Sequence, residues 1–293
     1  MKYILDERIL KIDVNSLYQE TIQDFFDEYI PSKKIQHLLI QNKRIKLDGN
    51  PVKRESEITG LNLEILLYPE EYNYEKLENK PLDVVYEDEF VLVVNKPKDI
   101  LVHSDGGNEI TLTSMVQSYL CDKNYCSAIP IHRLDKETCG MVVFSKSIIF
   151  QPLFDKLLEE KKIRRNYLAF VSGRYDNTQS ITINKPIGKD RHNANKRVIA
   201  KNGQEAITKV RSIKANKEYS ILRCTLATGR THQIRVHLVS IGYPILNDEL
   251  YGRSSKLLKR MGLIADELSL YHPLKEEMLE LEIDLPNDMN YLL

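Results

Sequence analysis

The sequence predicts an α+β fold, in which a small N-terminal α/β unit precedes a mixed, largely antiparallel sheet with flanking helices. Segments with the pattern of strands outnumber those with the pattern of helices, and several predicted strands follow one another directly. A doubly wound parallel sheet would instead alternate strands with helices. The pattern also changes after residues 70–81, which are polar, acidic and poor in β-branched residues. We therefore expect a domain at residues 1–69, a linker at 70–81 and a larger domain at 82–293.

The N-terminal unit is expected to contain two helices followed by short strands. Apolar residues at helical spacing predict a first helix, which Asn15 or Ser16 could cap. Pro31 then interrupts the pattern, and Ser32 is a candidate cap for the second helix. The expected elements are helices at 14–29 and from residue 32, a hairpin turn at 48–50 and a strand at 61–68.

In the larger domain, strands are expected to dominate. Apolar runs bounded by turn residues predict strands, and apolar residues three or four positions apart predict helices. The expected helices are residues 111–120, 148–160 and 231–241. The expected strands are residues 84–86, 90–95, 141–145, 164–172, 180–184, 205–215, 218–227, 268–272 and 278–283.

The composition argues against several classes of protein. Hydrophobic residues make up 42% and charged residues 29% of the 293 residues, as in a globular protein with a sizeable core. The first residues, MKYILDERILKID, are acidic where a signal peptide is apolar, and runs such as Val91–Val94 are too short to cross a bilayer. The four cysteines form no CxxC pair, so we expect reduced thiols in a cytoplasmic protein; they are Cys121, Cys126, Cys139 and Cys224.

The net charge is zero, but the charges are unevenly distributed. Residues 131–240 contain 22 basic and 9 acidic residues, a net charge of +13. The remaining segments, 1–70, 71–130 and 241–293, carry −2, −6 and −5. A basic block can be a solvated surface or a binding site for a polyanion. Because the motifs described next fall inside this block, a polyanion site is the favoured interpretation.

The segment Ile131–Lys146 contains the first candidate for a chemical role. Asp135 follows Arg133 by two residues and precedes Gly140 by five, in a predicted turn that leads into an apolar strand. Nearby cations favour the charged form of a carboxyl group, so Asp135 is expected to be ionised. The alternative is a loop aspartate that only caps a turn.

A second segment, residues 164–173, is a predicted strand that begins with two arginines. Alternation places Arg165, Tyr167 and Ala169 on one face of this strand. The alternative for Tyr167 is a half-buried structural tyrosine, which is common in strands.

The third segment, Thr228–Leu238, is a turn led by glycine that opens an amphipathic helix. Its first turns contain Arg230, His232 and Arg235, and arginines beside free backbone donors suit a phosphate or carboxylate. The alternative is a solvated helix face. His237 lies five residues after His232, which is not the spacing of two ligands on one helical face, so no metal site is expected.

Together these segments resemble the RluA family of pseudouridine synthases, and the resemblance spans most of residues 82–290. HRLDxxTxG followed by TGRxHQxRVH, in this order and at this spacing, is a specific combination. Cys139 departs from the pattern, where Ser is usual, and Arg164-Arg165 departs where the family has Lys. The matching stretches are His132–Gly140, Tyr167–Gly173, Thr228–Leu238, Gly242–Asp248, Tyr251-Gly252 and His272-Pro273.

The resemblance implies the pseudouridine-synthase fold and an isomerase that converts uridine in RNA to pseudouridine without cofactor or metal. It implies that Asp135 attacks the anomeric carbon of the ribose or assists removal of the neighbouring ribose proton, and the sequence leaves both routes open. Arg235 is expected to pair with Asp135. Tyr167 is expected to stack on the flipped uracil and is a candidate acceptor for the proton at carbon five.

The other polar residues of these motifs are expected to bind the RNA. Arg133 and Arg230 are expected to contact phosphate or to fill the gap left by the flipped base. The loop 188–203 is basic and rich in Asn, and is expected to contact the RNA backbone. The remaining expected substrate-binding residues of this domain are His132, Arg165 and His232.

The N-terminal unit resembles the alpha-L type of RNA-binding domain. The matching run is Ser32–Ile45, followed by Gly49 and Val52. Residues 33–54 contain seven Lys or Arg and one Asp. The resemblance implies that Lys33 and Lys34 bind RNA.

The expected partner is RNA, with ribosomal RNA favoured over transfer RNA, and the protein is expected to act as a monomer away from membranes. Two other functions would use the same features. An RNA-binding or chaperone-like protein would keep the fold without the chemistry, although the presence of Asp135 argues against this. A nucleoside glycosylase would use the same aspartate and release free uracil. The basic block disfavours an isomerase of small molecules.

Overall fold

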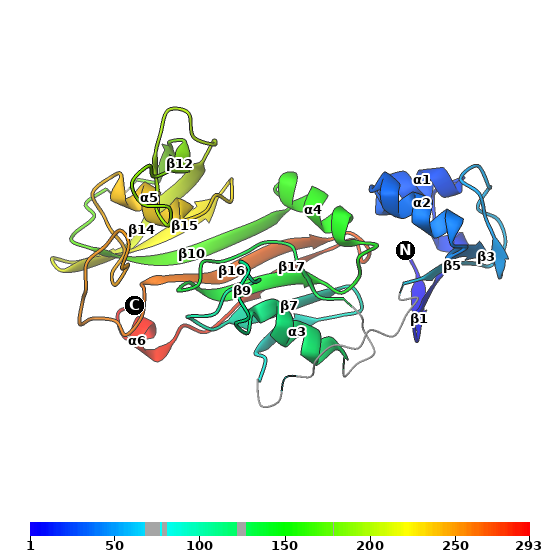
Figure 1. Cartoon of the computed structure of the whole chain (residues 1–293), viewed down its shortest axis with the longest axis horizontal. Coiled ribbons are helices and arrows are strands. Elements are labelled where there is room, and N and C mark those ends of the chain that lie inside the picture. Colours follow the sequence, from blue (N-terminus) through cyan, green and yellow to red (C-terminus); the bar gives the residue numbers. More distant parts are fainter. Residues whose placement is uncertain (68–76, 78–80, 122–126, 178) are drawn as a thin grey trace.

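The computed structural model describes residues 1–67, 77, 81–121, 127–177 and 179–293, and these residues form an α+β fold with three sheets (Figure 1). The largest sheet has ten strands and mixes one parallel pairing with antiparallel ones. The predicted α+β class with a largely antiparallel sheet is therefore confirmed. The predicted linker lies mostly outside the described residues, since only Leu77 and Pro81 of that segment are described.

The N-terminal unit is an antiparallel sheet of order β1-β2-β5-β3-β4 with two helices packed on it. Its helical elements are η1 (Val14–Ser16), α1 (Ile22–Tyr29) and α2 (Lys33–Gln41). Its strands are β1 (Tyr3–Asp6), β2 (Ile9–Asp13), β3 (Ile45–Leu47), β4 (Asn50–Pro51) and β5 (Asn62–Leu66).

Two features of this unit differ from the prediction. The hairpin β1–β2 was not expected, because its turn contains Glu7 at φ 51° rather than the Gly or Asn that signals such a turn. The predicted single helix over 14–29 is wrong, since α1 begins only after Thr21. The Thr21 side chain accepts a hydrogen bond from the Asp24 backbone, and Asp24 accepts one from the Thr21 backbone, which is a capping box. Ser32 stands at the N-cap of α2 but its side chain forms no capping bond.

The larger domain is built on the ten-stranded sheet, whose main path runs β11-β14-β15-β10-β16-β9-β7-β6. Its helices are α3 (Leu112–Cys121), α4 (Gln151–Glu159), α5 (Gln233–Val239) and α6 (Asn287–Asn290). The strands of its first half are β6 (Val84–Glu87), β7 (Val91–Lys96), β8 (Ile129–Pro130), β9 (Cys139–Ser145) and β10 (Ile163–Ser172). The later strands are β11 (Ile181–Asn184), β12 (Ile187–Lys189), β13 (Arg197–Ile199), β14 (Ile207–Ala215), β15 (Tyr219–Leu226), β16 (Leu263–His272) and β17 (Glu277–Glu282).

Side chains of the central strands alternate between two apolar clusters, one on each face of the sheet. On β7, Val91 and Val93 belong to the cluster that contains α4, whereas Leu92 and Val94 belong to the cluster that contains α3 and α5. This two-sided burial explains why β7 and β9 are continuous apolar runs rather than alternating ones. The sheet therefore forms a rigid floor for the loops at its strand ends.

The single parallel pairing, between β9 and β16, lies in the middle of the sheet. β9 enters it through Gly140, which has φ 115° and lies directly against the backbone of Ala265 on β16. Both the positive φ and this close approach require a residue without a Cβ. The loop that carries Asp135 immediately precedes this point, so the strand pairing fixes where that loop ends.

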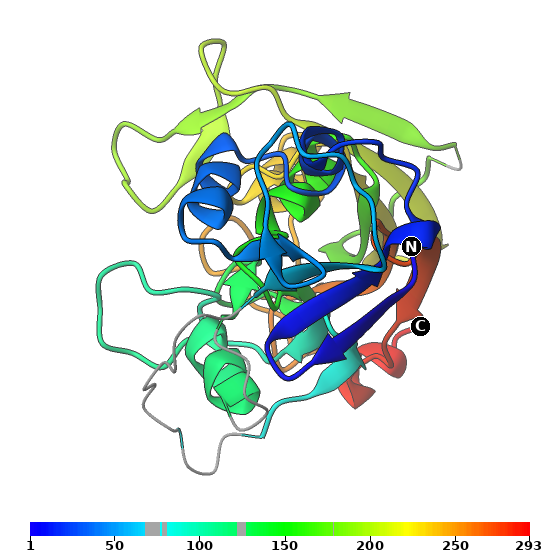
Figure 2. The same cartoon turned by 90° about the vertical axis from the view of Figure 1, so that its right-hand side faces the viewer.

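The N-terminal unit packs against one end of the larger domain and shares a continuous apolar cluster with it (Figures 1 and 2). The ring of Tyr3 packs edge-on against Phe90, with ring centroids 5.1 Å apart. The Tyr3 hydroxyl donates a hydrogen bond to Glu89, at 3.2 Å. Figure 1 places this unit at the right-hand end of the long axis, whereas β12 lies at the top of the opposite half. None of the helices in the described segments is long and apolar enough to cross a membrane.

We predict that Gly140→Ala strongly destabilises the larger domain, because a Cβ there would overlap the backbone of Ala265. Gly173→Ala is the matched control, since Gly173 also has positive φ, at 85°, but has open space around its Cβ position. The control should lose only the conformational term, about 1–2 kcal/mol. Urea unfolding of both variants measures the difference, and equal losses would show that the contact with Ala265 is unimportant.

Candidate active site

The three motif segments meet around one cavity of about 560 Å³. The loop before β9, the start of β10 and the turn that leads into α5 supply its walls, although Asp135 and Arg235 are 100 residues apart in sequence. Lys33 and Lys34 do not reach this cavity and lie exposed on α2 of the N-terminal unit. The predicted site residues that line it are His132, Arg133, Asp135, Arg165, Tyr167, Arg230, His232 and Arg235.

The loop that carries Asp135 is held from beneath by a buried lysine. Lys96, at the end of β7, has no exposed surface, and its ammonium donates to three backbone carbonyls. One of these is the carbonyl of Lys136, at 2.9 Å, directly after Asp135. An ammonium with three carbonyl acceptors satisfies its hydrogen-bonding needs inside the protein. Lys96 therefore fixes the height of the Asp135 loop above the sheet.

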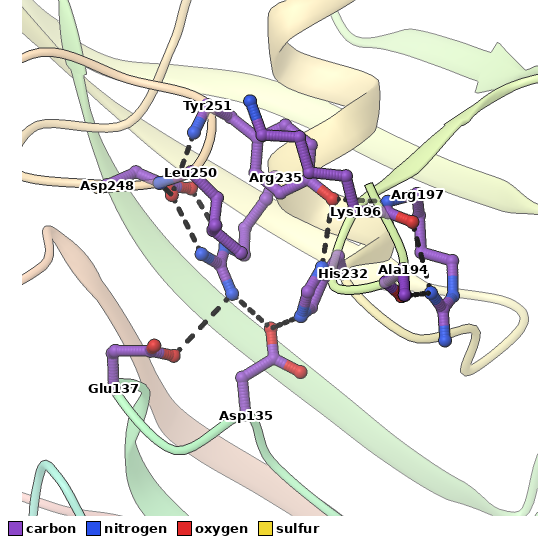
Figure 3. Close-up of polar contacts among 10 residues, drawn as sticks. All are labelled: Asp135, Glu137, Ala194, Lys196, Arg197, His232, Arg235, Asp248, Leu250 and Tyr251. Atoms are coloured by element: carbon purple, nitrogen blue, oxygen red, sulfur yellow. Dashed lines mark hydrogen bonds and ion pairs between the residues drawn. The ribbon is translucent and has the colours of Figure 1, made fainter. Parts of the chain in front are cut away.

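Arg235 forms hydrogen bonds with two carboxylates and has a third, that of Glu137, 3.6 Å from its Nη1 (Figure 3). Its Nε and Nη2 donate to the two oxygens of Asp248, at 2.8 and 2.7 Å, and its Nη1 donates to Oδ2 of Asp135, at 3.0 Å. The Arg235 side chain is 1% exposed and that of Asp248 is fully buried. Burial alone would disfavour the guanidinium cation, but the hydrogen bonds and charges of the two aspartates outweigh it and raise the pKa of Arg235 further.

The two oxygens of Asp135 have different surroundings. Oδ2 faces Nη1 of Arg235 and lies 3.9 Å from Nε2 of His232. Oδ1 has no hydrogen-bond partner among the described residues, and the side chain remains 18% exposed to the cavity. A carboxylate held through one oxygen can present the other to a bound substrate. Asp135 is thus the carboxylate of this site that is both oriented and accessible.

Tyr167 and Arg165 project from β10 into the cavity. Tyr167 is 4% exposed, and burial raises the pKa of its phenol while the nearby Arg165 charge opposes that change. The phenol is therefore protonated at neutral pH. Buried Nε of Arg165 has no hydrogen-bond partner among the described residues, which leaves a cationic donor at the wall of the cavity. The bare backbone of Gly229 leaves room for this guanidinium, whose nitrogens lie 3.4 Å from the position of an added Cβ.

His132 lines the cavity with a largely buried ring in a fixed tautomer. Its Nε2 accepts a hydrogen bond from the backbone N–H of Val143, at 3.3 Å. Burial, helped by the Arg165 charge, lowers the pKa of His132 well below its usual value, so the ring is neutral and its proton is on Nδ1. That Nδ1 is buried and has no partner among the described residues.

Arg133 and Arg230 lie at the rim of the cavity with exposed side chains. Nε of Arg230 donates to the carbonyl of Glu205, at 3.0 Å, which holds the side chain near the turn. Exposed cations at the mouth of a cavity are placed to meet an anionic backbone rather than a buried base.

Three residues of the site had been given no role from sequence: Asp248, Tyr251 and Lys96. Asp248 and Tyr251 belong to matching stretches of the family, but nothing in a linear sequence shows that they converge on Arg235. The available signal was physical, since a buried guanidinium with five donors requires more than one acceptor group. No group of three or more His, Cys, Asp or Glu within the described ranges is arranged to hold a metal ion.

Comparisons with known proteins agree with the geometry. The sequence model of the RNA pseudouridylate synthase family matches residues 90–240, which contain all three motif segments. Ribosomal large subunit pseudouridine synthase D of Haemophilus influenzae is 34% identical over 294 aligned residues, covering 94% of this chain and 89% of that protein. The chain belongs to the RNA pseudouridylate synthase family. It is therefore an isomerase that acts on uridine in RNA, and its assignment to the RluA family from sequence is confirmed.

Other relatives of this pseudouridine synthase support the same fold and family. An uncharacterized RNA pseudouridine synthase of Bacillus subtilis, YhcT, is 39% identical over 215 residues, covering 72% of this chain and 71% of that protein. The solved structure of human RNA pseudouridylate synthase domain containing 1 superposes with a TM-score of 0.59 at 24% identity, covering 72% of this chain and 86% of that one. The structural likeness shows the predicted pseudouridine-synthase fold. The alpha-L resemblance of the N-terminal unit stays a prediction.

We predict that Asp248→Asn destabilises the synthase by about 3–5 kcal/mol, because it removes the fully buried partner of the Arg235 cation. Asp135→Asn is the matched control, since Asp135 is partly exposed and Arg235 would keep its two bonds to Asp248. We expect the control to lose about 1 kcal/mol or less. Urea unfolding with circular dichroism measures both, and a larger loss for Asp135→Asn would reverse the assignment of the structural partner.

Proposed function

We propose that this enzyme isomerises specific uridines of ribosomal RNA and that Asp135 is its catalytic residue. The observation that carries the proposal is the free Oδ1 of Asp135, which opens into a cavity lined by arginines and an aromatic ring. The choice of ribosomal RNA is supported by the names of relatives from Haemophilus influenzae and Pasteurella multocida, each a ribosomal large subunit pseudouridine synthase D. Action on that RNA implies a cytoplasmic site of activity.

The proposed reaction begins with ionised Asp135 and ends with it unchanged. In one route Oδ1 attacks the anomeric carbon as its bond to N1 of uracil breaks; the uracil anion rotates, and its carbon five displaces Oδ1. In the other route the carboxylate removes the proton from the neighbouring ribose carbon while the bond to N1 breaks, which leaves a double bond in the ribose and a uracil anion. Carbon five of the uracil then adds to the anomeric carbon, and the carboxyl group returns the proton to the neighbouring carbon. Both routes end when carbon five loses its proton and N1 gains one. Neither route requires a cofactor or a metal, and we propose that none is used.

Tyr167 is proposed to stack on the uracil once it has left the RNA helix. Flipping a base out of a helix costs a few kcal/mol, and an aromatic ring in the wall of the cavity offsets part of that cost. Because burial raises the pKa of Tyr167, proton transfer to its phenolate would require a rare state at neutral pH. Stacking and hydrogen bonding are therefore the roles that its environment favours.

The arginines are proposed to hold the RNA around the flipped nucleotide. Exposed Arg133 and Arg230 at the rim are placed for phosphate or for the gap left by the base, and Arg165 has an unpartnered donor at the wall. His132, with a buried Nδ1–H, is proposed to line the base pocket. We propose that the active form is a monomer.

We predict that Asp135→Asn abolishes pseudouridine formation while the affinity for RNA stays within about twofold of the wild-type value. The amide keeps the shape but removes the charge needed by both routes, whereas phosphate contacts supply most of the affinity. Product can be measured by nucleoside mass spectrometry and binding by filter retention. Pseudouridine formation by the variant at the wild-type rate would contradict the role of Asp135. Release of free uracil by the wild-type protein would indicate a glycosylase.

A second RNA-binding surface is proposed on α2 of the N-terminal unit, where Lys33 and Lys34 are exposed. We also propose that residues 1–69 and 82–293 divide the work, with recognition in the first and chemistry in the second. Two surfaces on one chain raise apparent affinity without changing the catalytic site. Since the two parts share an apolar cluster, point variants on α2 test this proposal more cleanly than removal of the unit.

We predict that the double variant Lys33→Ala, Lys34→Ala binds RNA more weakly but keeps its turnover at saturating RNA. Loss of two phosphate contacts should reduce the slope of log affinity against log salt by about 1.5. Lys11→Ala is the matched control, since Lys11 lies on β2 and pairs with Asp6 at 2.8 Å. Equal salt slopes for the wild-type protein and the double variant would show that α2 does not bind the substrate.

A further inference from the structure

Tyr251 occupies a central position between the β12–β13 hairpin and the catalytic carboxylate (Figure 3). Its hydroxyl lies 2.6 Å from the backbone nitrogen of Arg197, at the start of β13, and 2.9 Å from Nδ1 of His232. Its ring lies under the guanidinium of Arg235, 5.2 Å from the centroid. The ring holds the phenol in place, while the hydroxyl touches both the hairpin and the histidine.

The direction of these hydrogen bonds follows from their donors. A backbone N–H can only donate, so the Tyr251 oxygen accepts from Arg197. The phenolic O–H is then free to donate a hydrogen bond, and we take Nδ1 of His232, 2.9 Å away, as its acceptor. A neutral imidazole that accepts at Nδ1 has its own proton on Nε2. Burial, together with the charges of Arg235 and Arg197, lowers the pKa of His232 against the opposing effect of Asp135, and this favours the neutral ring.

His232 has a backbone conformation that points its ring at the carboxylate. It stands at the N-cap of α5 with φ 57°, in the left-handed region that non-glycine residues seldom occupy. In this position Nε2 lies 3.9 Å from Oδ2 of Asp135, the same oxygen that Arg235 holds. Oδ2 thus accepts a hydrogen bond from Arg235 and has the His232 ring beside it, beyond hydrogen-bonding distance, while Oδ1 is left without a partner among the described residues.

We propose that Tyr251 is a positioning residue for the reaction, whose hydroxyl fixes His232 with its Nε2–H towards Oδ2 of Asp135 and ties the basic hairpin to this pair. The inference rests on the proposed role of Asp135. Tyr251 itself touches neither the reacting atoms nor the RNA. It acts through His232, which lies beside Oδ2 and helps to hold the carboxylate in the orientation that leaves Oδ1 free.

The hairpin gives this arrangement a connection to the bound RNA. Its tip, residues 190–196, is exposed in large part, and Lys196 places its ammonium 5.7 Å from the centroid of the Tyr251 ring. The Arg197 side chain folds back to donate to the carbonyls of Ala194 and Lys196, at 3.2 and 3.0 Å, which stiffens the tip. RNA that presses on the hairpin therefore acts on the backbone N–H that orients the Tyr251 hydroxyl.

The first test is the single-turnover rate of Tyr251→Phe with RNA bound to excess enzyme. The variant keeps the ring against Arg235 and loses only the hydroxyl, so we expect a rate about tenfold lower and an RNA affinity within twofold. Tyr219→Phe is the matched control, because it removes a buried hydroxyl that donates to the Leu292 carbonyl far from the cavity, at 2.9 Å. The control should react at the wild-type rate. A wild-type rate for Tyr251→Phe would overturn the proposal.

The second test separates positioning from packing by combining Tyr251→Phe with His232→Asn. Asparagine tolerates positive φ and so preserves the turn, but it lacks a donor at the position of Nε2. If Tyr251 acts through His232, the double variant should be no more than twofold slower than His232→Asn alone. A full tenfold further loss would show that Tyr251 acts independently, which overturns the proposal.

The third test reads the histidine directly. In protein with ¹⁵N-labelled histidine, the signal that is lost in His232→Asn should show an unprotonated Nδ1 and a protonated Nε2. A proton on Nδ1 would overturn the proposed hydrogen-bond direction. All three tests use a wild-type enzyme that forms pseudouridine. If the wild-type enzyme forms none, the proposed function fails. If it forms the product and Tyr251→Phe reacts at the wild-type rate, only this inference is rejected.

Discussion

The active site depends on how one buried cation divides its hydrogen bonds between two carboxylates, with the carboxylate of Glu137 3.6 Å away. Arg235 donates two hydrogen bonds to Asp248, whose side chain is shielded from solvent. It donates one to Asp135, whose side chain is partly exposed to solvent. Because Asp248 already balances the guanidinium, Asp135 is oriented by the cation without being fully neutralised by it. Its second oxygen, Oδ1, has no hydrogen-bond partner among the described residues and is free for a substrate. The complete burial of Asp248 and the free, accessible oxygen of Asp135 thus both follow from the way Arg235 divides its hydrogen bonds.

The sheet supplies the precision that this arrangement needs. The Asp135 loop is fixed at one end by the close contact of Gly140 with β16 and from beneath by Lys96. Arg235 comes from a short helix whose first residue follows a strained histidine. Side chains from rigid elements converge within hydrogen-bonding distance only if their backbones are set to a fraction of an ångström. The single parallel pairing, between β9 and β16 at the centre of the sheet, fixes the backbone position from which the Asp135 loop is set.

Sequence reasoning succeeded where one physical signal dominated and failed where a contact between distant residues decided the outcome. Buried strands such as β7 and β9 were predicted because each contains a continuous apolar run. The helix over residues 14–29 was wrong because apolar spacing was weighed above the capping box at Thr21. Asp135 and Arg235 could be named from their motifs, but the roles of Asp248 and Tyr251 could not. Those roles exist only after residues far apart in the chain have come together.

The apolar cluster that joins the N-terminal unit to the larger domain also fixes the distance between helix α2 and the cavity. With Tyr3 packed on Phe90, helix α2 cannot change its distance from the cavity without exposing buried rings to water. A flexibly tethered module would accept any RNA that offers two binding regions, whatever the distance between them. A rigidly attached unit accepts only an RNA whose two contact regions are separated by the distance between α2 and the cavity. Together with the RNA contact proposed for α2, this fixed separation would favour a uridine that lies at a matching distance from the second contact in a folded RNA.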